Sequence, residues 1–223
     1  MQGNVRKNLR AVENELAGTA VRLLPVSKTF PASRIREAYE AGYRDFGENR
    51  VQEILEKRPQ LPEDIRWHLI GHLQSNKVKQ IAPFIHLIHS VDSEKLLEEI
   101  QKQAVRAGRR LAVLLQVHIA EEESKSGWDA AELRKWVNQG GPGRFPDVDF
   151  LGLMGMATFT EDEEKIRKEF RSLAELKAEL SAASHFSNFQ LEELSMGMSG
   201  DYRIAVEEGS TLVRMGSAVF GGR

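Results

Sequence analysis

The sequence contains no cysteine, which excludes disulfides, thiolate nucleophiles and cysteine-based zinc sites. It also contains no long apolar run, because no window approaches the roughly 18 consecutive apolar residues of a membrane-spanning helix. Residues 1–16 are polar and amphipathic and lack the apolar core of a signal peptide. We therefore expect a cytoplasmic protein without a membrane partner.

An excess of charge of one sign is missing as well. The 31 Lys and Arg side chains nearly balance the 33 Asp and Glu side chains, and the net charge is −2. This balance gives no broad attraction for nucleic acid, so we expect no nucleic-acid partner and only a local anion site. There is neither a G-x-G-x-x-G at a strand-to-helix turn nor a G-x-x-x-x-G-K-[ST], so the nucleotide-binding fingerprints are absent.

Histidine spacing gives little support for a metal site. His68 and His72, and likewise His86 and His89, are spaced like ligand pairs, but neither pair falls on a convincing helix. The zinc-binding motif H-E-x-x-H is absent. We predict no metal site.

Short apolar runs alternate with helical patterns along the chain, which is typical of parallel β/α units. The 223 residues, 41% of them hydrophobic, suffice for one well-buried core, and no linker divides them. We therefore expect residues 1–223 to form a single domain of the α/β class, a (β/α)8 TIM-type barrel with an extra N-terminal helix, because eight parallel strands close without exposed edges. The expected strands are 21–28, 43–46, 66–70, 85–89, 111–119, 148–154, 191–195 and 211–215.

Local signals mark several helices and turns between these strands. Thr160 and Glu163 predict a capping box that opens a long helix. Residues 140–143, Gly-Gly-Pro-Gly, predict a surface turn. Pro25 is unusual inside a central strand because it cannot donate to the sheet ladder, and we expect a bulge there. The long helix has the predicted apolar stripe Ile166, Phe170, Leu173, Leu176 and Leu180.

Candidate site residues lie where strands of the predicted barrel end, which is where this fold places reactive groups. Lys28 ends the first strand, and Arg214 lies near the end of the eighth. Because side chains alternate along a strand, Arg214 and Gly216 should both face inward. Gly216, Ser217 and Ser199 can offer N–H and hydroxyl groups to an anion.

An amine beside an anion pocket points to a phosphorylated carbonyl ligand. Asn49 and His68 fall near other strand ends, where they can reach a ligand ring. A strand-terminal lysine alone is more often a solvated surface group, and only its pairing with the distant Arg-x-Gly-Ser favours a site. This reasoning leaves open a Schiff-base sugar-phosphate aldolase.

Several motifs closely resemble the YggS/PROSC family of pyridoxal-phosphate-binding proteins. They are residues 26–29, 46–53, 67–77, 122–127, 152–154, 194–199 and 209–221, which follow the family's order over nearly the whole chain. The resemblance implies a barrel similar to the alanine racemase N-terminal domain. It also implies that Lys28 holds pyridoxal 5′-phosphate as an internal aldimine, with Arg214 beside the pyridine nitrogen. Phosphate contacts are implied for Ser199, Gly216 and Ser217.

The resemblance also implies a function in intracellular vitamin B6 homeostasis. An arginine at the pyridine nitrogen disfavours its protonation, which favours holding the cofactor over catalysis. We expect a monomeric protein that carries or buffers pyridoxal phosphate and passes it to pyridoxal-phosphate-dependent apo-enzymes, without substantial catalysis. A racemase-like pyridoxal-phosphate enzyme remains an alternative, because it would use the same lysine as a base.

Overall fold

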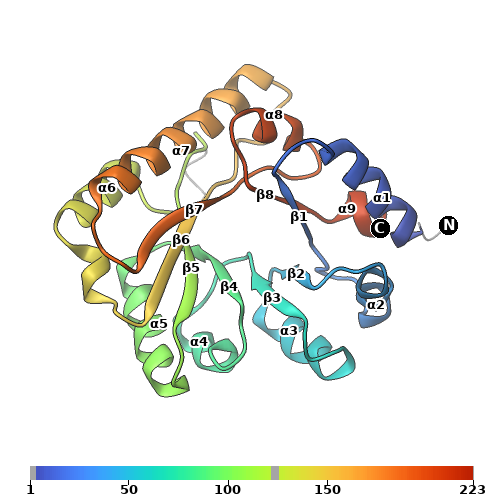
Figure 1. The fold of residues 1–223 in the computed structure, drawn as a ribbon, viewed down its shortest axis with the longest axis horizontal. Coiled ribbons are helices and arrows are strands. Elements are labelled where there is room, and N and C mark those ends of the chain that lie inside the picture. Colours follow the sequence, from blue (N-terminus) through green and yellow to red (C-terminus); the bar gives the residue numbers. More distant parts are fainter. Residues whose placement is uncertain (1–3, 122–125, 223) are drawn as a thin grey trace.

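Eight parallel strands and their flanking helices form the structure, a computed structural model that describes residues 4–121 and 126–222 (Figure 1). This arrangement confirms the predicted (β/α)8 barrel and its extra N-terminal helix. The strands are β1 Arg22–Pro25, β2 Asp45–Glu48, β3 Arg66–Leu69, β4 Leu87–Val91, β5 Leu111–Gln116, β6 Val148–Met154, β7 Phe189–Ser195 and β8 Leu212–Met215.

Helices cover the outside of this barrel (Figure 1). The first, α1, packs beside the short C-terminal helix α9, where Asn8 Nδ2 donates to Val219 O at 2.9 Å. The helices are α1 Val5–Leu16, α2 Ala32–Glu40, α3 Val51–Lys57, α4 Ser75–Ile81, α5 Glu94–Ala107, α6 Ala130–Asn138, α7 Glu163–Ala183, α8 Tyr202–Glu207 and α9 Ser217–Phe220, with 3-10 turns η1 Arg58–Gln60 and η2 Gly141–Arg144.

The barrel closes weakly between its first two strands. The sheet runs β1-β8-β7-β6-β5-β4-β3-β2, and β1 meets β2 through an isolated bridge between Val26 and Gly47. Val26 N–H donates to Met215 O at 2.8 Å, whereas Ser27 N–H donates to Gly47 O at 2.9 Å. Because successive N–H groups point to opposite sides, the Pro25 nitrogen faces β2, where the ladder is sparse.

The predicted bulge at Pro25 is wrong. β1 and β8 pair in continuous register from Arg22 with Leu212 to Pro25 with Met215. The proline is tolerated because its missing donor falls on the weakly paired side of β1. The strand also ends at Pro25 rather than at Lys28, so Lys28 lies in the following turn.

The long helix α7 begins differently from the prediction. Asp162 is its N-cap, with Oδ1 accepting from Lys165 N–H at 3.1 Å, while Thr160 Oγ1 accepts from Asp162 N–H at 3.2 Å. The capping box of Thr160 and Glu163 is therefore wrong, because the ionised Asp162 takes the capping position two residues later. The predicted apolar stripe of α7 is confirmed, since all five of its side chains are buried.

The predicted surface turn at residues 140–143 is only partly confirmed. Gly141 and Pro142 are buried in η2. A Cβ on Gly141 would lie 2.3 Å from Trp136 Cε2, so the missing side chain lets this backbone pack against the indole ring.

The main apolar core lies between the sheet and its helices, and the barrel interior is more mixed. A small apolar cluster of Leu87, Leu114 and Met154 occupies part of the interior. Polar side chains from several strands are buried as well, and they belong to the site described below. Within residues 4–121 and 126–222, no helix combines the length and the apolar character needed to cross a bilayer.

Candidate functional site

Lys28 lies in a tight turn after β1. Thr29 has a φ of +67°, the positive-φ conformation that L-residues rarely adopt. Thr29 N–H donates to Glu53 Oε2 at 2.7 Å, and Phe30 N–H donates to Ser27 O at 3.1 Å. The turn is thus held on both sides of Lys28, which is partly buried and makes no hydrogen bond or ion pair with the described residues.

A buried charge cluster, which we call the Lys57 clamp, fixes this turn to β2 and α3. Lys57 Nζ donates to Ser27 O at 2.9 Å, to Glu48 Oε1 at 2.7 Å and to Glu53 Oε2 at 2.8 Å. Ser27 Oγ also donates to Glu48 Oε1, at 2.7 Å. One ammonium therefore joins the Lys28 turn to two carboxylates in a site with little water.

Glu48 is the most strongly perturbed member of the Lys57 clamp. Burial raises the pKa of Glu48 to about 7, although the Lys57 ammonium and the Ser27 hydroxyl lower it. Its Oε2 atom is buried and has no hydrogen-bond partner in the described part of the chain. Glu48 thus takes part in the clamp through one of its two carboxylate oxygens.

Arg214 points into the barrel from β8, as its position in the strand predicts. Its side chain is buried, with Nη1 donating to Ser195 O and Ser195 Oγ, both at 2.7 Å, and Nη2 donating to Gly155 O at 3.0 Å. Burial lowers the pKa of Arg214 to about 10, against the opposing effect of Asp201, so the guanidinium stays charged at neutral pH. Among the ion pairs of the described residues, none includes Arg214.

Lys28 and Arg214 come from neighbouring strands. Leu24 pairs with Arg214 in the β1–β8 ladder, and Gly216 follows the end of β8 beside Val26. A Cβ on Gly216 would lie 3.3 Å from Val26 O, so this glycine lets the two chain segments approach closely. The structure therefore brings the predicted amine and the predicted Arg-x-Gly-Ser segment to one side of the barrel mouth.

Ser199 and Ser217 meet where the loops after β7 and β8 come together. Ser217 Oγ donates to Ser199 Oγ at 3.4 Å. Gly216 precedes α9, whose first internal bond runs from Val219 N–H to Gly216 O at 3.0 Å. The N–H groups of residues 216–218 therefore precede the first bond of that turn, next to two hydroxyls.

Asn49 and His68 lie at different depths of the barrel, one at its rim and the other in its interior. Asn49 directly follows β2 on the same rim as Lys28, and its backbone packs against Gly71, whose added Cβ would lie 2.4 Å from Asn49 O. His68 lies within β3, is buried and uses both ring nitrogens: Nδ1 lies 2.9 Å from His89 Nε2, and Nε2 lies 3.0 Å from Asp45 Oδ1. Direct contact with a ligand stays a prediction for both residues.

Sequence reasoning missed several polar residues around this site. Glu48 and Lys57 hold the Lys28 turn, and Ser195 and His89 continue from Arg214 across the barrel. Ser195 is the last residue of β7, so the rule that carboxyl strand ends carry function was a usable signal for it. The motif at residues 122–127 is only partly described, because residues 122–125 lie outside the described part.

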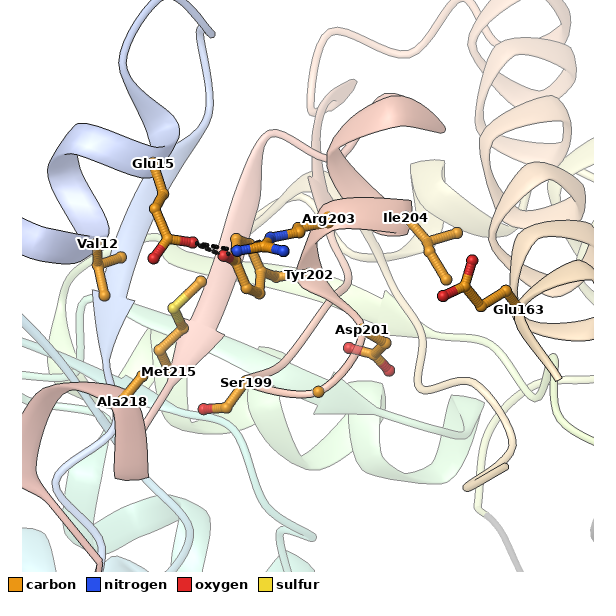
Figure 2. A pocket seen from close by; sticks show the side chains of 11 residues that line it. Val12, Glu15, Glu163, Ser199, Asp201, Tyr202, Arg203, Ile204, Met215 and Ala218 are labelled. Carbon is orange, nitrogen blue, oxygen red and sulfur yellow. Dashed lines mark hydrogen bonds and ion pairs between the residues drawn. The ribbon is translucent and has the colours of Figure 1, made fainter. Parts of the chain in front are cut away.

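A pocket of about 410 Å³ lies beside Ser199, with residues of α1, α8 and the end of β8 in its walls (Figure 2). Ser199 is the one predicted site residue that lines it, with Met215 and Ala218 on the side of β8 and α9. On its opposite wall, Arg203 pairs with Glu15 of α1 at 3.1 Å. The pocket therefore lies next to the predicted phosphate contacts but does not contain Lys28 or Arg214.

Known proteins resemble this chain along nearly its whole length. Residues 2–223 match the family described as the N-terminal domain of alanine racemase. The pyridoxal phosphate homeostasis protein of Aquifex aeolicus is 43% identical over 203 residues, covering 91% of this chain and 87% of that protein. Its Homo sapiens namesake is 40% identical over 219 residues, covering 94% of this chain and 79% of that protein.

Solved structures agree with this similarity. PipY of Synechococcus elongatus is 39% identical, and the match covers 97% of this chain and 100% of that one. Its structure without PLP gives a TM-score of 0.90, and its structure with PLP bound gives 0.87. Alanine racemase from Bartonella henselae, at 20% identity and a TM-score of 0.74, shares the fold over 98% of this chain and 58% of its own.

Proposed function

The chain belongs to the family of pyridoxal phosphate homeostasis proteins, and from this membership we propose that it binds pyridoxal 5′-phosphate covalently through Lys28. The observation that carries the proposal is that the turn of Lys28, whose amine has no hydrogen bond or ion pair among the described residues, adjoins the segment that carries buried Arg214 and Ser217. Condensation of the amine with the cofactor's aldehyde forms a C=N bond and releases water.

The described residues offer such a ligand suitable charges and hydrogen-bonding groups. Arg214 brings to the site a buried cation that forms no ion pair among the described residues, and it would lie beside the ring nitrogen. Ser199, Gly216 and Ser217 would hold the phosphate through hydroxyl and N–H groups. Asn49 would approach the ring from the rim after β2, and His68, whose ring nitrogens bond His89 and Asp45, would support the ring from inside the barrel.

We propose that the protein holds the cofactor rather than using it for substantial catalysis. Pyridoxal phosphate supplies an electron-accepting ring when bound, and a cation at its nitrogen weakens that capacity by disfavouring protonation. The names of the similar proteins support a function in vitamin B6 homeostasis. Residues 1–223 would then act as one cytoplasmic, monomeric binding domain that carries or buffers the cofactor and supplies apo-enzymes.

The racemase-like and aldolase alternatives gain no specific support from the described residues. Alanine racemase of Bartonella henselae is 20% identical to this chain, a similarity that concerns the fold alone. For the Schiff-base sugar-phosphate aldolase, the titration described below is the discriminating test. Turnover assays with D- and L-amino acids test the racemase alternative directly.

Titration of the purified protein with pyridoxal phosphate tests the proposed function. Wild type and the control Lys79→Ala, on the exposed side of α4, should each gain a visible absorption band at one equivalent. Lys28→Ala should gain no such band, because it lacks the amine. Borohydride reduction followed by peptide mapping should place the label on Lys28. A label on another lysine, or an unchanged band in Lys28→Ala, would contradict the proposal.

A further inference from the structure

A chain of hydrogen bonds crosses the interior of the barrel. Arg214 Nη1 donates to Ser195 Oγ at 2.7 Å, and Ser195 Oγ lies 3.0 Å from His89 Nδ1. His89 Nε2 lies 2.9 Å from His68 Nδ1, and His68 Nε2 lies 3.0 Å from Asp45 Oδ1. We call these five residues the histidine relay.

The histidine relay joins strands that are not neighbours. Ser195 lies on β7 and His89 on β4, and the sheet order places β5 and β6 between these strands. Their hydrogen bond therefore spans the barrel interior. The relay runs from the carboxyl end of β7 to Asp45, the first residue of β2, so it connects the candidate site with the opposite mouth of the barrel.

The two ends of the histidine relay fix the direction of every hydrogen bond in it. A guanidinium can only donate and an ionised carboxylate can only accept. At the Asp45 end, His68 must donate from Nε2, so the Nδ1 of its neutral ring accepts from His89 Nε2–H. The neutral ring of His89 then accepts at Nδ1 from the Ser195 hydroxyl, whose oxygen accepts from Arg214. All four hydrogen bonds thus point from Arg214 towards Asp45.

Burial keeps both rings in the neutral form that this direction requires. Desolvation lowers the pKa of His68 and lowers that of His89 well below the ordinary value. Although burial raises the pKa of Asp45, hydrogen bonds from His68 and Arg66 hold it well below its usual range, so the acceptor end stays ionised. The other charged or titratable groups near the two rings are Arg22, His86 and Arg214, and each of them disfavours a proton on His89.

The Asp45 end can also be considered as a cation site. Ligand atoms of Asp45, His68 and His86 lie within 4.8 Å of one another. However, Arg66 Nε already donates to Asp45 Oδ1 at 2.8 Å, and Arg66 Nη2 reaches Oδ2 of the same carboxylate. A cation there would meet a guanidinium, so the hydrogen-bonded arrangement accounts better for these side chains.

We propose that Ser195, His89, His68 and Asp45 are positioning residues that orient the Arg214 guanidinium towards the ring of the bound cofactor. The arginine is buried, its hydrogen bonds to the described residues go to neutral oxygens, and the histidine relay couples it to the Asp45 carboxylate through neutral groups. Arginine does not release its proton at ordinary pH, so the relay orients a cation and does not conduct a proton from it. The part of this inference that concerns the cofactor ring rests on the proposed function.

The first test needs no ligand. Nitrogen-15 NMR of histidine-labelled protein at pH 7.5 reports the tautomer of each ring, and His68→Gln and His89→Gln assign the two buried resonances. Both rings should be neutral and protonated on Nε2. A neutral Nδ1–H form or a doubly protonated form of either ring would overturn the relay. Coordination shifts of His68 on addition of Zn²⁺ alone would also overturn it.

The second test compares two buried serines of the β7–β8 region. Ser195→Ala removes the hydroxyl that links Arg214 to His89, whereas the control Ser210→Ala removes a hydroxyl that donates to Met196 O at 2.8 Å and lies outside the relay. After pyridoxal phosphate titration, Ser195→Ala should show a shifted absorption band with an altered pH profile and about tenfold weaker retention. Ser195→Thr, which keeps the hydroxyl, should restore the wild-type band.

The outcomes separate the relay from the proposed function. If wild type binds the cofactor on Lys28 and Ser195→Ala matches Ser210→Ala in band position and pH profile, the positioning inference is wrong. If wild type does not bind the cofactor at all, the proposed function fails. In that case the tautomers measured without ligand still decide whether the histidine relay exists.

Discussion

The two sides of the candidate site each contain a buried cationic side chain, Lys57 on one side and Arg214 on the other, and they hold these cations in opposite ways. On the β1 side, the Lys57 clamp surrounds the Lys28 turn with an ammonium and two carboxylates in direct contact. On the β8 side, the hydrogen bonds of Arg214 to the described residues go to neutral acceptors, and the histidine relay links it onward to the Asp45 carboxylate. The comparison shows that one barrel can position two cations either through paired charges or through oriented neutral dipoles.

The stability that the two sides contribute should therefore change with pH in opposite directions. The folded-state pKa of Glu48 is raised from 4.5 to about 7, so the stability it contributes is fully present below 4.5 and is lost as pH rises through about 7. The folded-state pKa values of His68 and His89 are lowered from 6.5. Their contribution is fully present above 6.5 and is lost as pH falls towards those lowered values.

Removing the ammonium of the Lys57 clamp should have the largest effect on stability. Lys57→Met leaves Glu48 and Glu53 as neighbouring buried or partly buried carboxylates without their cation, which should cost about 3–5 kcal/mol of unfolding free energy. Urea denaturation at pH 7.5 measures this loss. Lys79→Met on α4 is the control and should change the free energy by less than about 0.5 kcal/mol. Equal effects of the two variants would show that the clamp adds nothing.

Neutralising Glu48 should remove the pH dependence of the β1 side. A pKa raised by burial from 4.5 to about 7 corresponds to on the order of 3 kcal/mol of unfolding free energy between those pH values. In Glu48→Gln, the decline of stability from pH 4.5 to 7 should shrink by about that amount. Glu56→Gln on the exposed face of α3 is the control, and denaturation midpoints across this range are the measurement. A slope identical to that of wild type would contradict a titrating Glu48.

Replacing one histidine of the relay should weaken a pH dependence of stability that has the opposite sign to that of Glu48. Wild type should lose up to about 1.4 kcal/mol of unfolding free energy per pH unit below 6.5 for each buried neutral histidine. His89→Gln should lose less than wild type over pH 6.5 to 5.5, because its side chain does not titrate. The exposed His185→Gln should retain the wild-type slope. If His89→Gln also retains it, His89 is not a neutral buried ring.

The smallest effect is expected at the solvent end of the histidine relay. The side chains of Arg66 and Asp45 are 53% and 26% exposed, so their ion pair should contribute at most about 1 kcal/mol. Arg66→Met should therefore lower the unfolding free energy only slightly and raise the pKa of Asp45, which NMR titration of that carboxyl can follow. A loss as large as that of Lys57→Met would remove the distinction between the two sides.

The fold was largely predictable because strands and amphipathic helices leave periodic apolar patterns. The stripe of α7 is an example, since spacing alone identified its buried face. Strand ends were less predictable: β2 lies at Asp45–Glu48 rather than 43–46, because Asp45, Gly47 and Glu48 interrupt the apolar pattern although they belong to the strand. Capping was mispredicted where Asp162 and Thr160 competed for the same helix end.

The main residues of the site were predictable from the sequence, but the residues that hold them in place were not. Lys28 and Arg214 could be paired from sequence because the fold places carboxyl strand ends together. The Lys57 clamp could not be predicted in this way, because it joins a residue at the end of α3 to the turn after β1 and to a glutamate of β2. His89 was similarly hidden, since its partner Ser195 lies 106 positions away in the sequence and on a strand across the barrel.

The weak closure between β1 and β2 has a consequence for motion. Backbone pairing there is an isolated bridge, yet Ser27 and Lys57 tie the end of β1 to Glu48 at the end of β2. Side chains therefore hold this seam together, and one of them, Glu48, has a pKa that burial raises to about 7. Lys28 and the Gly216 segment lie together on the β1–β8 side of the seam. Local opening of the seam would therefore move Asn49 away from them without separating Lys28 from the Gly216 segment. Deuterium uptake at the Ser27 amide reports on that opening.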